Sequence, residues 1–196
     1  MSGSQDREEG EGIRTFICIE IPESVKERIA ELQRHLRQLD SRVSWTKPSN
    51  IHLTLKFLGD VSPSRKERVR QATERSVTSI TPFEIEVGGA GCFPSPRAPR
   101  VLWVGLVTLP ESLKQLRERL EEELFREGFA RESKRFSPHL TIGRVRDPRN
   151  SSRLAEELQA RGFESEKFQA RELIVMRSEL KPTGSVYTAQ ATISLR

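Results

Sequence analysis

Two histidines draw attention because each is followed, two residues later, by a threonine within an alternating apolar and polar segment. The segments are Ile51–Leu55 (IHLTL) and Pro138–Ile142 (PHLTI). In a β-strand, residues i and i+2 point to one face and lie about 6.6–6.8 Å apart along the chain. Each segment therefore predicts a half-buried strand that presents an imidazole beside a hydroxyl, with aliphatic neighbours held in the core.

An imidazole and a hydroxyl at this spacing can reach one small anionic group, such as a phosphate. If both strands face one cleft, a neutral imidazole can take a proton from an attacking oxygen, while a protonated imidazole donates one to the leaving oxygen. The hydroxyls of Thr54 and Thr141 would donate hydrogen bonds to the nonbridging oxygens. The residues therefore predict displacement at a phosphodiester, with His52 and His139 as an acid–base pair whose individual roles stay open.

The surroundings of the two segments repeat in the same order. Ile21–Lys26 (IPESVK) resembles Leu109–Lys114 (LPESLK), and the two prolines precede His52 and His139 by 30 and 29 residues. Around each segment we expect a strand and a helix before it, and a loop, a helix and a strand after it. This order predicts a duplicated unit, with halves at about 13–90 and 100–180, whose packing about a pseudo-twofold axis brings the histidines together.

The remaining elements follow from hydrophobic periodicity and from proline and glycine signals. We predict strands over 14–21, 83–87, 101–109 and 168–179, and helices beginning at Pro22, at Ser62 (to about 79), at Pro110 and over about 151–161. The segment 88–99 is dense in glycine and proline, which predicts a long loop. A C-terminal hairpin is expected over 172–195, with its turn at 181–184. Residues 1–12 have no apolar run, so we expect a flexible tail followed by one bilobal domain over 13–196.

Composition narrows the class of protein. In 196 residues, 35% are hydrophobic, and no run approaches the roughly 20 apolar residues of a membrane helix. Cys18 and Cys92 are too few for a disulfide framework or a zinc cluster. We therefore expect a cytoplasmic protein without membrane contact, and nothing in the sequence requires more than a monomer. The net charge of +5 permits an anionic partner.

Other sites use the same residues less well. Asp60 and Asp147 each follow a histidine by eight residues, but eight residues of strand span about 26 Å, whereas ligands lie about 2 Å from a metal. We therefore expect no metal and interpret both aspartates as turn or helix-start residues. Nucleophilic catalysis by serine or cysteine has no elbow motif here. A purely structural role for the histidines, paired with polar groups in the core, stays open.

The motifs HLTL at 52–55 and HLTI at 139–142 resemble the paired His-x-Thr-x motifs of the two-histidine (2H) phosphoesterase superfamily. The flanking segments are similar to one branch, the RNA 2′,3′-cyclic phosphodiesterases, once called 2′-5′ RNA ligases. These segments are IHLTLKFLGDV at 51–61, GCFPSPRAPRVLWVGL at 91–106, FSPHLTIGRV at 136–145 and SELKPTGSVY at 178–187. The resemblance spans nearly the whole chain beyond the first dozen residues.

The resemblance implies a bilobal duplicated α+β fold, in which two mainly antiparallel sheets line a central cleft with helices outside. It also implies hydrolysis of 2′,3′-cyclic phosphates on RNA ends or small oligonucleotides to 2′-phosphomonoesters, with no metal or other cofactor. His52 matches the proton donor to the leaving 3′-oxygen and His139 the base that activates water. Thr54, Thr141 and Arg144 match phosphate-binding positions.

Other uses of the same site stay open. They are 2′-5′ ligation of RNA, hydrolysis of small cyclic nucleotides, and binding of RNA ends without catalysis. A purely structural or protein-interaction domain is the remaining alternative.

Five residues near the motifs have two interpretations each. Arg144 has the wrong parity to share the face of the second histidine, so either Gly143 supplies a bulge that redirects it or it is a surface arginine. Lys56 has the parity of the first histidine and either meets the phosphate or is solvated. Phe57 either stacks on a terminal base or belongs to the core.

The last two are further from the motifs. Arg135 has the parity of the second histidine but can lie outside its strand. Tyr187, the only tyrosine, either lines the cleft or packs structurally.

Overall fold

The computed structural model describes residues 12–39, 41–147, 151–182 and 184–196, and these form one antiparallel sheet covered by α-helices. The expected tail lies outside the described residues except for Gly12. The strands are β1 (Ile13–Glu20), β2 (Val43–Trp45), β3 (His52–Val61), β4 (Phe83–Phe93), β5 (Val101–Leu106), β6 (Leu140–Val145), β7 (Glu166–Ala170), β8 (Glu172–Lys181) and β9 (Gly184–Ser194). The helices are α1 (Glu23–Leu36), α2 (Lys66–Ser76), α3 (Glu111–Arg126) and α4 (Ser151–Arg161), with 3₁₀ turns at Pro48–Asn50 and Pro63–Arg65.

The order of the strands repeats about the centre of the sheet. It reads β7-β4-β5-β6-β3-β1-β8-β9, with β2 paired to β6. Exchanging β5 with β1, β6 with β3, β4 with β8 and β7 with β9 gives the same order read from the other end, so equivalent strands have equivalent neighbours. We call β1, β3, β8 and β9 the first lobe, and β2, β4, β5, β6 and β7 the second lobe.

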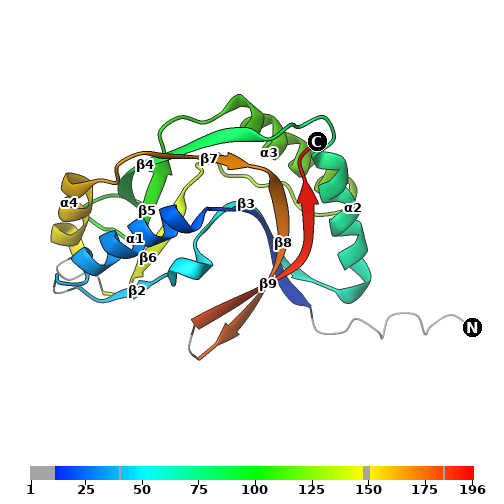
Figure 1. Cartoon of the computed structure of the whole chain (residues 1–196). Coiled ribbons are helices and arrows are strands. Elements are labelled where there is room, and N and C mark those ends of the chain that lie inside the picture. Colours follow the sequence, from blue (N-terminus) through cyan, green and yellow to red (C-terminus); the bar gives the residue numbers. More distant parts are fainter. Residues whose placement is uncertain (1–11, 40, 148–150, 183) are drawn as a thin grey trace, which may run out of the picture.

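The lobes meet where β3 crosses β6, through the single residue pair Leu53 and Leu140. The predicted α+β class and antiparallel pairing are confirmed. The two expected sheets are, however, joined by this pair into one strongly curved sheet (Figure 1). β8 and β9 pair along their length as a hairpin that extends from the first lobe.

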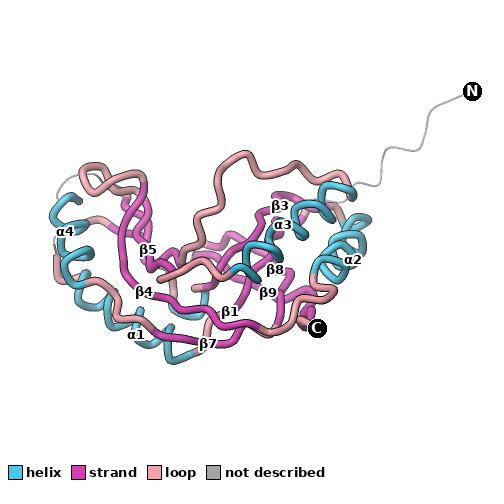
Figure 2. Tube along the Cα trace, turned by 90° about the horizontal axis from the view of Figure 1, so that it is seen from above, coloured by secondary structure: helices cyan, strands magenta, loops and turns pink. Residues whose placement is uncertain are grey.

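Each repeat sends its first helix across to the other lobe. α1 follows β1 in sequence but lies beside α4, and α3 follows β5 but lies beside α2 (Figures 1 and 2). The side-chain amide of Gln33 on α1 donates to the carbonyls of Thr46 and Ile142, each at 2.8 Å, which fixes α1 on the second lobe. Arg75 of α2 pairs with Glu123 of α3 at 2.6 Å on the first lobe.

The helices bury apolar stripes against one face of the sheet. Hydrophobic spacing predicts a stripe on each of α1 and α3. Leu39, predicted as the last member of the first stripe, lies beyond α1 and is partly buried. The other members are at most 4% exposed: Val25, Ile29, Leu32, Leu36, Leu113, Leu116, Leu120 and Leu124. Burying one such side chain stabilises the fold by about 1.5–3 kcal/mol. A second, smaller cluster of Phe16, Cys18, Ile174 and Met176 lies apart from this core. Because side chains alternate along β1, this cluster occupies the opposite face, which we call the open face.

One predicted loop is wrong, because β4 continues through Gly88–Phe93. The indole of Trp103 on β5 packs against Gly91, where a Cβ atom would lie only 2.6 Å from the ring. Gly89 occupies a bulge with φ +65°. The glycines therefore allow a close approach of an aromatic ring and a bulge within a strand, rather than a loop. The irregular segment is limited to 94–100.

Other boundaries differ by a few residues. The predicted strand over 168–179 divides at Arg171 into β7 and β8, which pair with different neighbours. β5 and α2 each end three residues before their predicted ends. The predicted turn at 181–184 includes residue 183, which lies outside the described residues. Within the described ranges, no helix has the length and hydropathy needed to cross a membrane.

Candidate active site

The two His-Thr segments meet at the crossing of β3 and β6. Leu53 and Leu140 are paired there, and both side chains are fully buried on the helix-covered face. The residues before and after each leucine therefore point to the open face. In the register of this pair, His52 lies opposite Thr141, and His139 lies opposite Thr54. Residues diagonal to each other in such a pair are about 7–8 Å apart, so the two histidines can flank one phosphate.

Both imidazoles are held by the same backbone contact. Nδ1 of His52 lies 2.8 Å from the carbonyl oxygen of Asn50, and Nδ1 of His139 lies 2.8 Å from that of Ser137. A carbonyl only accepts, so Nδ1 carries the proton in both rings. Nε2 is therefore the nitrogen left for chemistry in each histidine, as a base when neutral and as an acid when protonated.

A β-bulge follows each histidine at the same distance. Between β1 and β3, Cys18 pairs with Thr54 and Ile17 with Lys56, which leaves Leu55 unopposed. Between β5 and β6, Trp103 pairs with Thr141 and Leu102 with Gly143, which leaves Ile142 unopposed. An extra residue reverses the alternation of the side chains that follow. Phe57 and Arg144, each five residues after its histidine, are thereby turned to the open face.

The bulge overturns both interpretations of Lys56. Its side chain is 4% exposed on the helix side, where the ammonium group pairs with the carboxylate of Glu121 at 2.9 Å and donates to the Ala130 carbonyl at 2.7 Å. Glu121 also pairs with Arg117. Lys56 is therefore neither solvated nor able to meet a phosphate between the histidines. Its predicted parity was wrong because it assumed a regular strand.

The same bulges place Phe57 and Arg144 on the open face. Phe57 is 58% exposed, and its ring lies 5.9 Å from that of Phe16, so the interpretation as a core residue is wrong. Arg144 is exposed, and its neighbour Gly143 faces Val43 in the core. The extra residue of the second bulge is Ile142, directly before Gly143.

Arg135 and Tyr187 have different positions. Arg135 is exposed and lies five residues before β6, so the parity of a strand does not apply to it. Tyr187, on β9, is close to the first histidine, and its ring meets the ring of His52 edge-on at 5.3 Å and that of Phe16 at 5.0 Å. Tyr187 therefore both packs structurally and borders the site.

The surroundings of the two histidines are unequal. His52 stacks on Phe16 with ring centroids 4.6 Å apart, and burial lowers the pKa of His52 to about 4 against the opposing effect of its hydrogen bond to Asn50. His139 meets the edge of Phe93 at 5.1 Å and borders a pocket of about 270 Å³ that Trp103 also lines. Phe16, Phe93 and Trp103 were not predicted as site residues. The available signals were the apolar run around Phe16 and the family-like segment 91–106, which contains Phe93 and Trp103.

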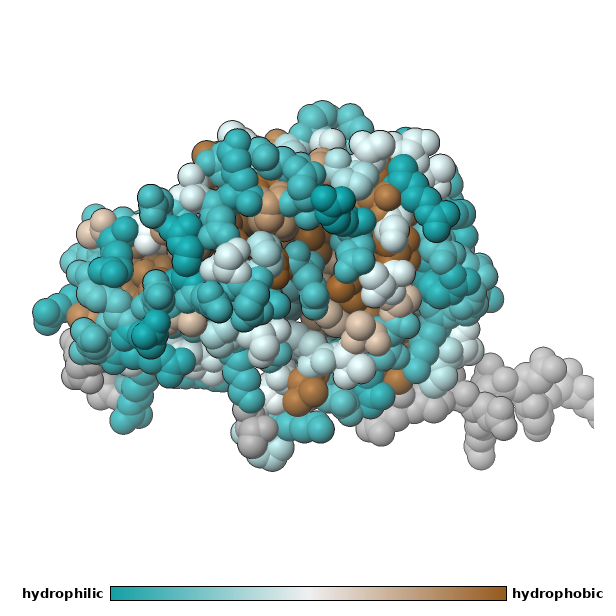
Figure 3. All heavy atoms as spheres, viewed as in Figure 1, coloured by the Kyte–Doolittle hydropathy of each residue, from teal (hydrophilic) through white to brown (hydrophobic). Residues whose placement is uncertain are grey.

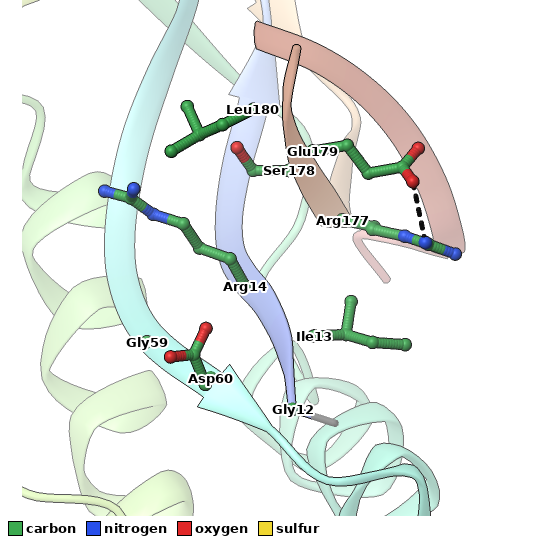
Figure 4. Close-up of a pocket in the computed structure, with 9 residues that line it drawn as sticks. All are labelled: Gly12, Ile13, Arg14, Gly59, Asp60, Arg177, Ser178, Glu179 and Leu180. Atoms are coloured by element: carbon green, nitrogen blue, oxygen red, sulfur yellow. Dashed lines mark hydrogen bonds and ion pairs between the residues drawn. The ribbon is translucent and has the colours of Figure 1, made fainter. Parts of the chain in front are cut away.

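A larger cavity lies elsewhere. It has a volume of about 640 Å³ and is bordered by the first residues of β1, the end of β3 and the outer part of β8 (Figure 4). Neither histidine lines it, and its Arg177 is paired with Glu179 at 2.8 Å. The larger volume of this cavity therefore does not identify the site.

Hydrophilic residues cover most of the molecular face in Figure 3, and apolar residues are visible between them near the middle.

Comparisons with known proteins show the family of this chain. The family model described as the 2′-5′ RNA ligase superfamily matches residues 21–182. A protein of Methanothermobacter thermautotrophicus named RNA 2′,3′-cyclic phosphodiesterase is 37% identical over 177 residues, covering 90% of this chain and 95% of that protein. A protein of Archaeoglobus fulgidus with the same name is 33% identical, covering 89% of this chain and 96% of that protein.

Two solved structures share the fold. A Thermus thermophilus protein superposes with a TM-score of 0.77 at 26% identity, covering 94% of this chain and 98% of that one. Escherichia coli LigT, complexed with phosphate, superposes with a TM-score of 0.71 at 22% identity over 94% and 98% of the two chains. The second likeness concerns the fold alone.

Proposed function

The chain belongs to the 2′-5′ RNA ligase superfamily, and we propose that it hydrolyses 2′,3′-cyclic phosphates at RNA ends, leaving a 2′-phosphomonoester and a free 3′-hydroxyl. The observation that carries the proposal is the doubled site around Leu53 and Leu140, where each histidine keeps Nε2 free on the open face. Relatives named RNA 2′,3′-cyclic phosphodiesterase support the choice of substrate.

The reaction is a displacement at phosphorus. Water attacks from the side opposite the 3′-oxygen, and Nε2 of His139 takes the proton that the water loses. The bond from phosphorus to the 3′-oxygen breaks, and Nε2–H of His52 donates a proton to that oxygen. The hydroxyls of Thr54 and Thr141 donate to the nonbridging oxygens as charge builds on them. Protons and bonds balance, because one water is consumed and the 2′-phosphate remains on the RNA.

The role of His52 as donor imposes a condition on the reaction. Because the pKa of His52 is about 4, its imidazole is neutral near pH 7 in the free protein. An anionic phosphate beside the ring favours the charged form and raises this pKa. His52 therefore takes up its proton as the substrate binds. If the roles of the two histidines were exchanged, the neutral His52 of the free protein could act as the base directly.

Residues around the pair complete the site. Arg144 and Phe57 occupy equivalent positions in the two repeats, both turned outward by a bulge. We assign Arg144 to the reacting phosphate, a role that suits a guanidinium because it offers paired donors. The exposed face of Phe57 offers a stacking surface for the terminal base.

Substitution of either histidine tests the proposal. The substrate is an RNA oligonucleotide with a 2′,3′-cyclic phosphate end, and the products are separated into 2′- and 3′-phosphates. We expect His52→Ala and His139→Ala each to lower kcat by about 10²–10⁴-fold. The control is His35→Ala, which replaces the remaining histidine of the chain, on α1, and should keep its activity. Near wild-type hydrolysis by either active-site variant, or a 3′-phosphate product, would contradict the mechanism.

We also propose that the protein works as a cytoplasmic monomer and that residues 13–196 form one domain. Cys18 and Cys92 are both buried free thiols, and burial raises the pKa of Cys18 to about 12, which suits a reducing compartment. Light scattering and cell fractionation test these statements. Removal of residues 1–12 should leave the melting temperature unchanged.

A further inference from the structure

Three arginines form a row on the open face of the second lobe. Arg144 and Arg146 lie at the end of β6, and the backbone N–H of Arg146 donates to the carbonyl of Arg42 at 2.8 Å, next to β2. Val43, which follows Arg42, and Val145, which separates Arg144 from Arg146, pack against the core. Since side chains alternate along paired strands, the arginines point away from that core. They therefore share the face of Thr141.

The arginines of this row form no ion pair among the described residues. Other exposed arginines, such as Arg68 on α2, are also unpaired, so what distinguishes the row is that its members are neighbours. Within the described residues, Arg42, Arg144 and Arg146 are all exposed and form no ion pair; Arg146 has only a hydrogen bond of 3.4 Å to the Ser44 hydroxyl. Unpaired cations gathered at one end of a site produce a positive potential that attracts a polyanion.

The row extends beyond the reach of one phosphate. Arg144 is the member nearest the histidines and is already assigned to the reacting group. Arg146 lies two residues further along, a distance of about 6.6 Å, and Arg42 is opposite it on the neighbouring segment. These two arginines are thus placed for a different phosphate of the same ligand.

We propose that Arg42 and Arg146 bind backbone phosphates of the RNA on the 5′ side of the cyclic phosphate, so that the site prefers oligonucleotides to mononucleotides. This inference rests on the proposed function. Single-stranded RNA offers one phosphate per nucleotide, and a groove that combines cations with aromatic rings is the usual way to bind it. Here the cations continue directly from Arg144, while Phe57 and Tyr187 supply rings on the first lobe.

The test compares two substrates and two matched variants. The substrates are 2′,3′-cyclic AMP and a five-nucleotide RNA ending in a 2′,3′-cyclic phosphate. One variant combines Arg42→Gln with Arg146→Gln. The control is Arg68→Gln on α2, which removes an arginine that is also exposed and unpaired within the described chain. For each protein, kcat/KM is measured at several salt concentrations.

We expect the wild type and the control to prefer the five-nucleotide RNA, and the double variant to lose about tenfold or more on that substrate. Its kcat/KM for 2′,3′-cyclic AMP should stay at the wild-type value. The slope of log(kcat/KM) against log salt should fall by about 0.7 for each phosphate that the variant no longer binds. Equal losses on both substrates, no preference for the longer substrate in the wild type, or the same loss in Arg68→Gln would overturn the proposal.

Binding separates this proposal from the proposed function. A five-nucleotide RNA with a 2′-phosphate end, which is the expected product, is titrated in fluorescence anisotropy with the same three proteins. If hydrolysis fails in the wild type but the double variant alone binds more weakly and with a smaller salt slope, the arginine row stands while the activity does not. If the double variant binds as the wild type does, the arginine row is wrong.

Discussion

The imidazole of His52 lies face to face with the ring of Phe16, with centroids 4.6 Å apart and planes inclined by 21°. His139 has no such partner among the described residues and meets the edge of Phe93 instead. Two residues with nearly identical sequence surroundings are therefore held in different environments. The difference originates outside the repeated motif, because Phe16 lies on β1, which pairs with β3, whereas Phe93 lies on β4, which does not pair with β6.

The first prediction concerns the stability of the fold at low pH. The pKa of His52 is about 4 in the folded protein, below the value near 6.5 of the unfolded chain, so the unfolded state binds this proton first. The contribution of His52 is complete above about pH 6.5 and is lost as the pH falls towards 4. Urea unfolding at pH 7 and pH 5 should show this loss in the wild type and a smaller one in His52→Gln. An unchanged pH dependence in that variant would contradict the burial effect.

The second prediction concerns the response of His52 to a bound anion. Inorganic phosphate between the histidines should raise the pKa of His52, because the anion stabilises the imidazolium. Titration of the imidazole C–H signals by NMR, with and without phosphate, measures this change, and His35 on α1 serves as the internal reference. If phosphate broadens or shifts the signals of His139 while the pKa of His52 stays about 4, the donor role belongs to the other histidine.

The third prediction concerns Phe57. Replacement by alanine should raise KM for a cyclic phosphate substrate without changing the free energy of unfolding, since the side chain is 58% exposed. Stacking of a base on an aromatic ring contributes about 1–3 kcal/mol, which sets the size of the effect. Phe57→Trp should keep a low KM because it preserves the ring. A KM for Phe57→Ala equal to that of the wild type would show that the base lies elsewhere.

The fourth prediction concerns the buried ion pair of Lys56. Glu121 is the shared partner of two buried cations, because it pairs with both Lys56 and Arg117. Glu121→Ala leaves both cations without a counter-charge, so it should lower the free energy of unfolding by about 3–5 kcal/mol. Lys56→Met should cost less, because Glu121 keeps Arg117 as its partner. Chemical denaturation measures both. A stable Lys56→Met with weakened phosphate binding would instead return Lys56 to the site.

The sequence predicted the parts of the fold that depend on periodicity. The stripes of α1 and α3, the two His-Thr segments and the repeated order of elements all follow from residue spacing, because burial selects one face of a helix or strand. The α+β class and the family followed as well. Spacing also placed His52, Thr54, His139 and Thr141 on shared faces, because no bulge interrupts the strand between each histidine and its threonine.

Beyond Thr54 and Thr141, side-chain orientation could not be predicted from residue spacing, for a local reason. A bulge inserts one residue without any obligatory change in composition, so Leu55 and Ile142 look like regular strand residues. Lys56 was therefore assigned to the open face, and residue spacing could not decide between stacking and core packing for Phe57. Segment 88–99 failed for the opposite reason. Gly91 makes room for the ring of Trp103. The sequence alone does not distinguish a glycine that allows close packing of a neighbouring side chain from a glycine that allows a turn.

The exchange of α1 and α3 between the lobes has a consequence for assembly. Gln33 reaches Ile142 across 109 residues of sequence, so the second lobe acquires α1 beside α4 only when the N-terminal part of the chain has joined it. A protein made of one such repeat would leave part of its sheet uncovered and would have one histidine. Such a protein would have to dimerise and exchange helices with its second copy, which would complete the core and bring two histidines together. The tandem chain joins the two copies covalently, so the residues around each histidine can differ, as Phe16 at His52 and Phe93 at His139 do.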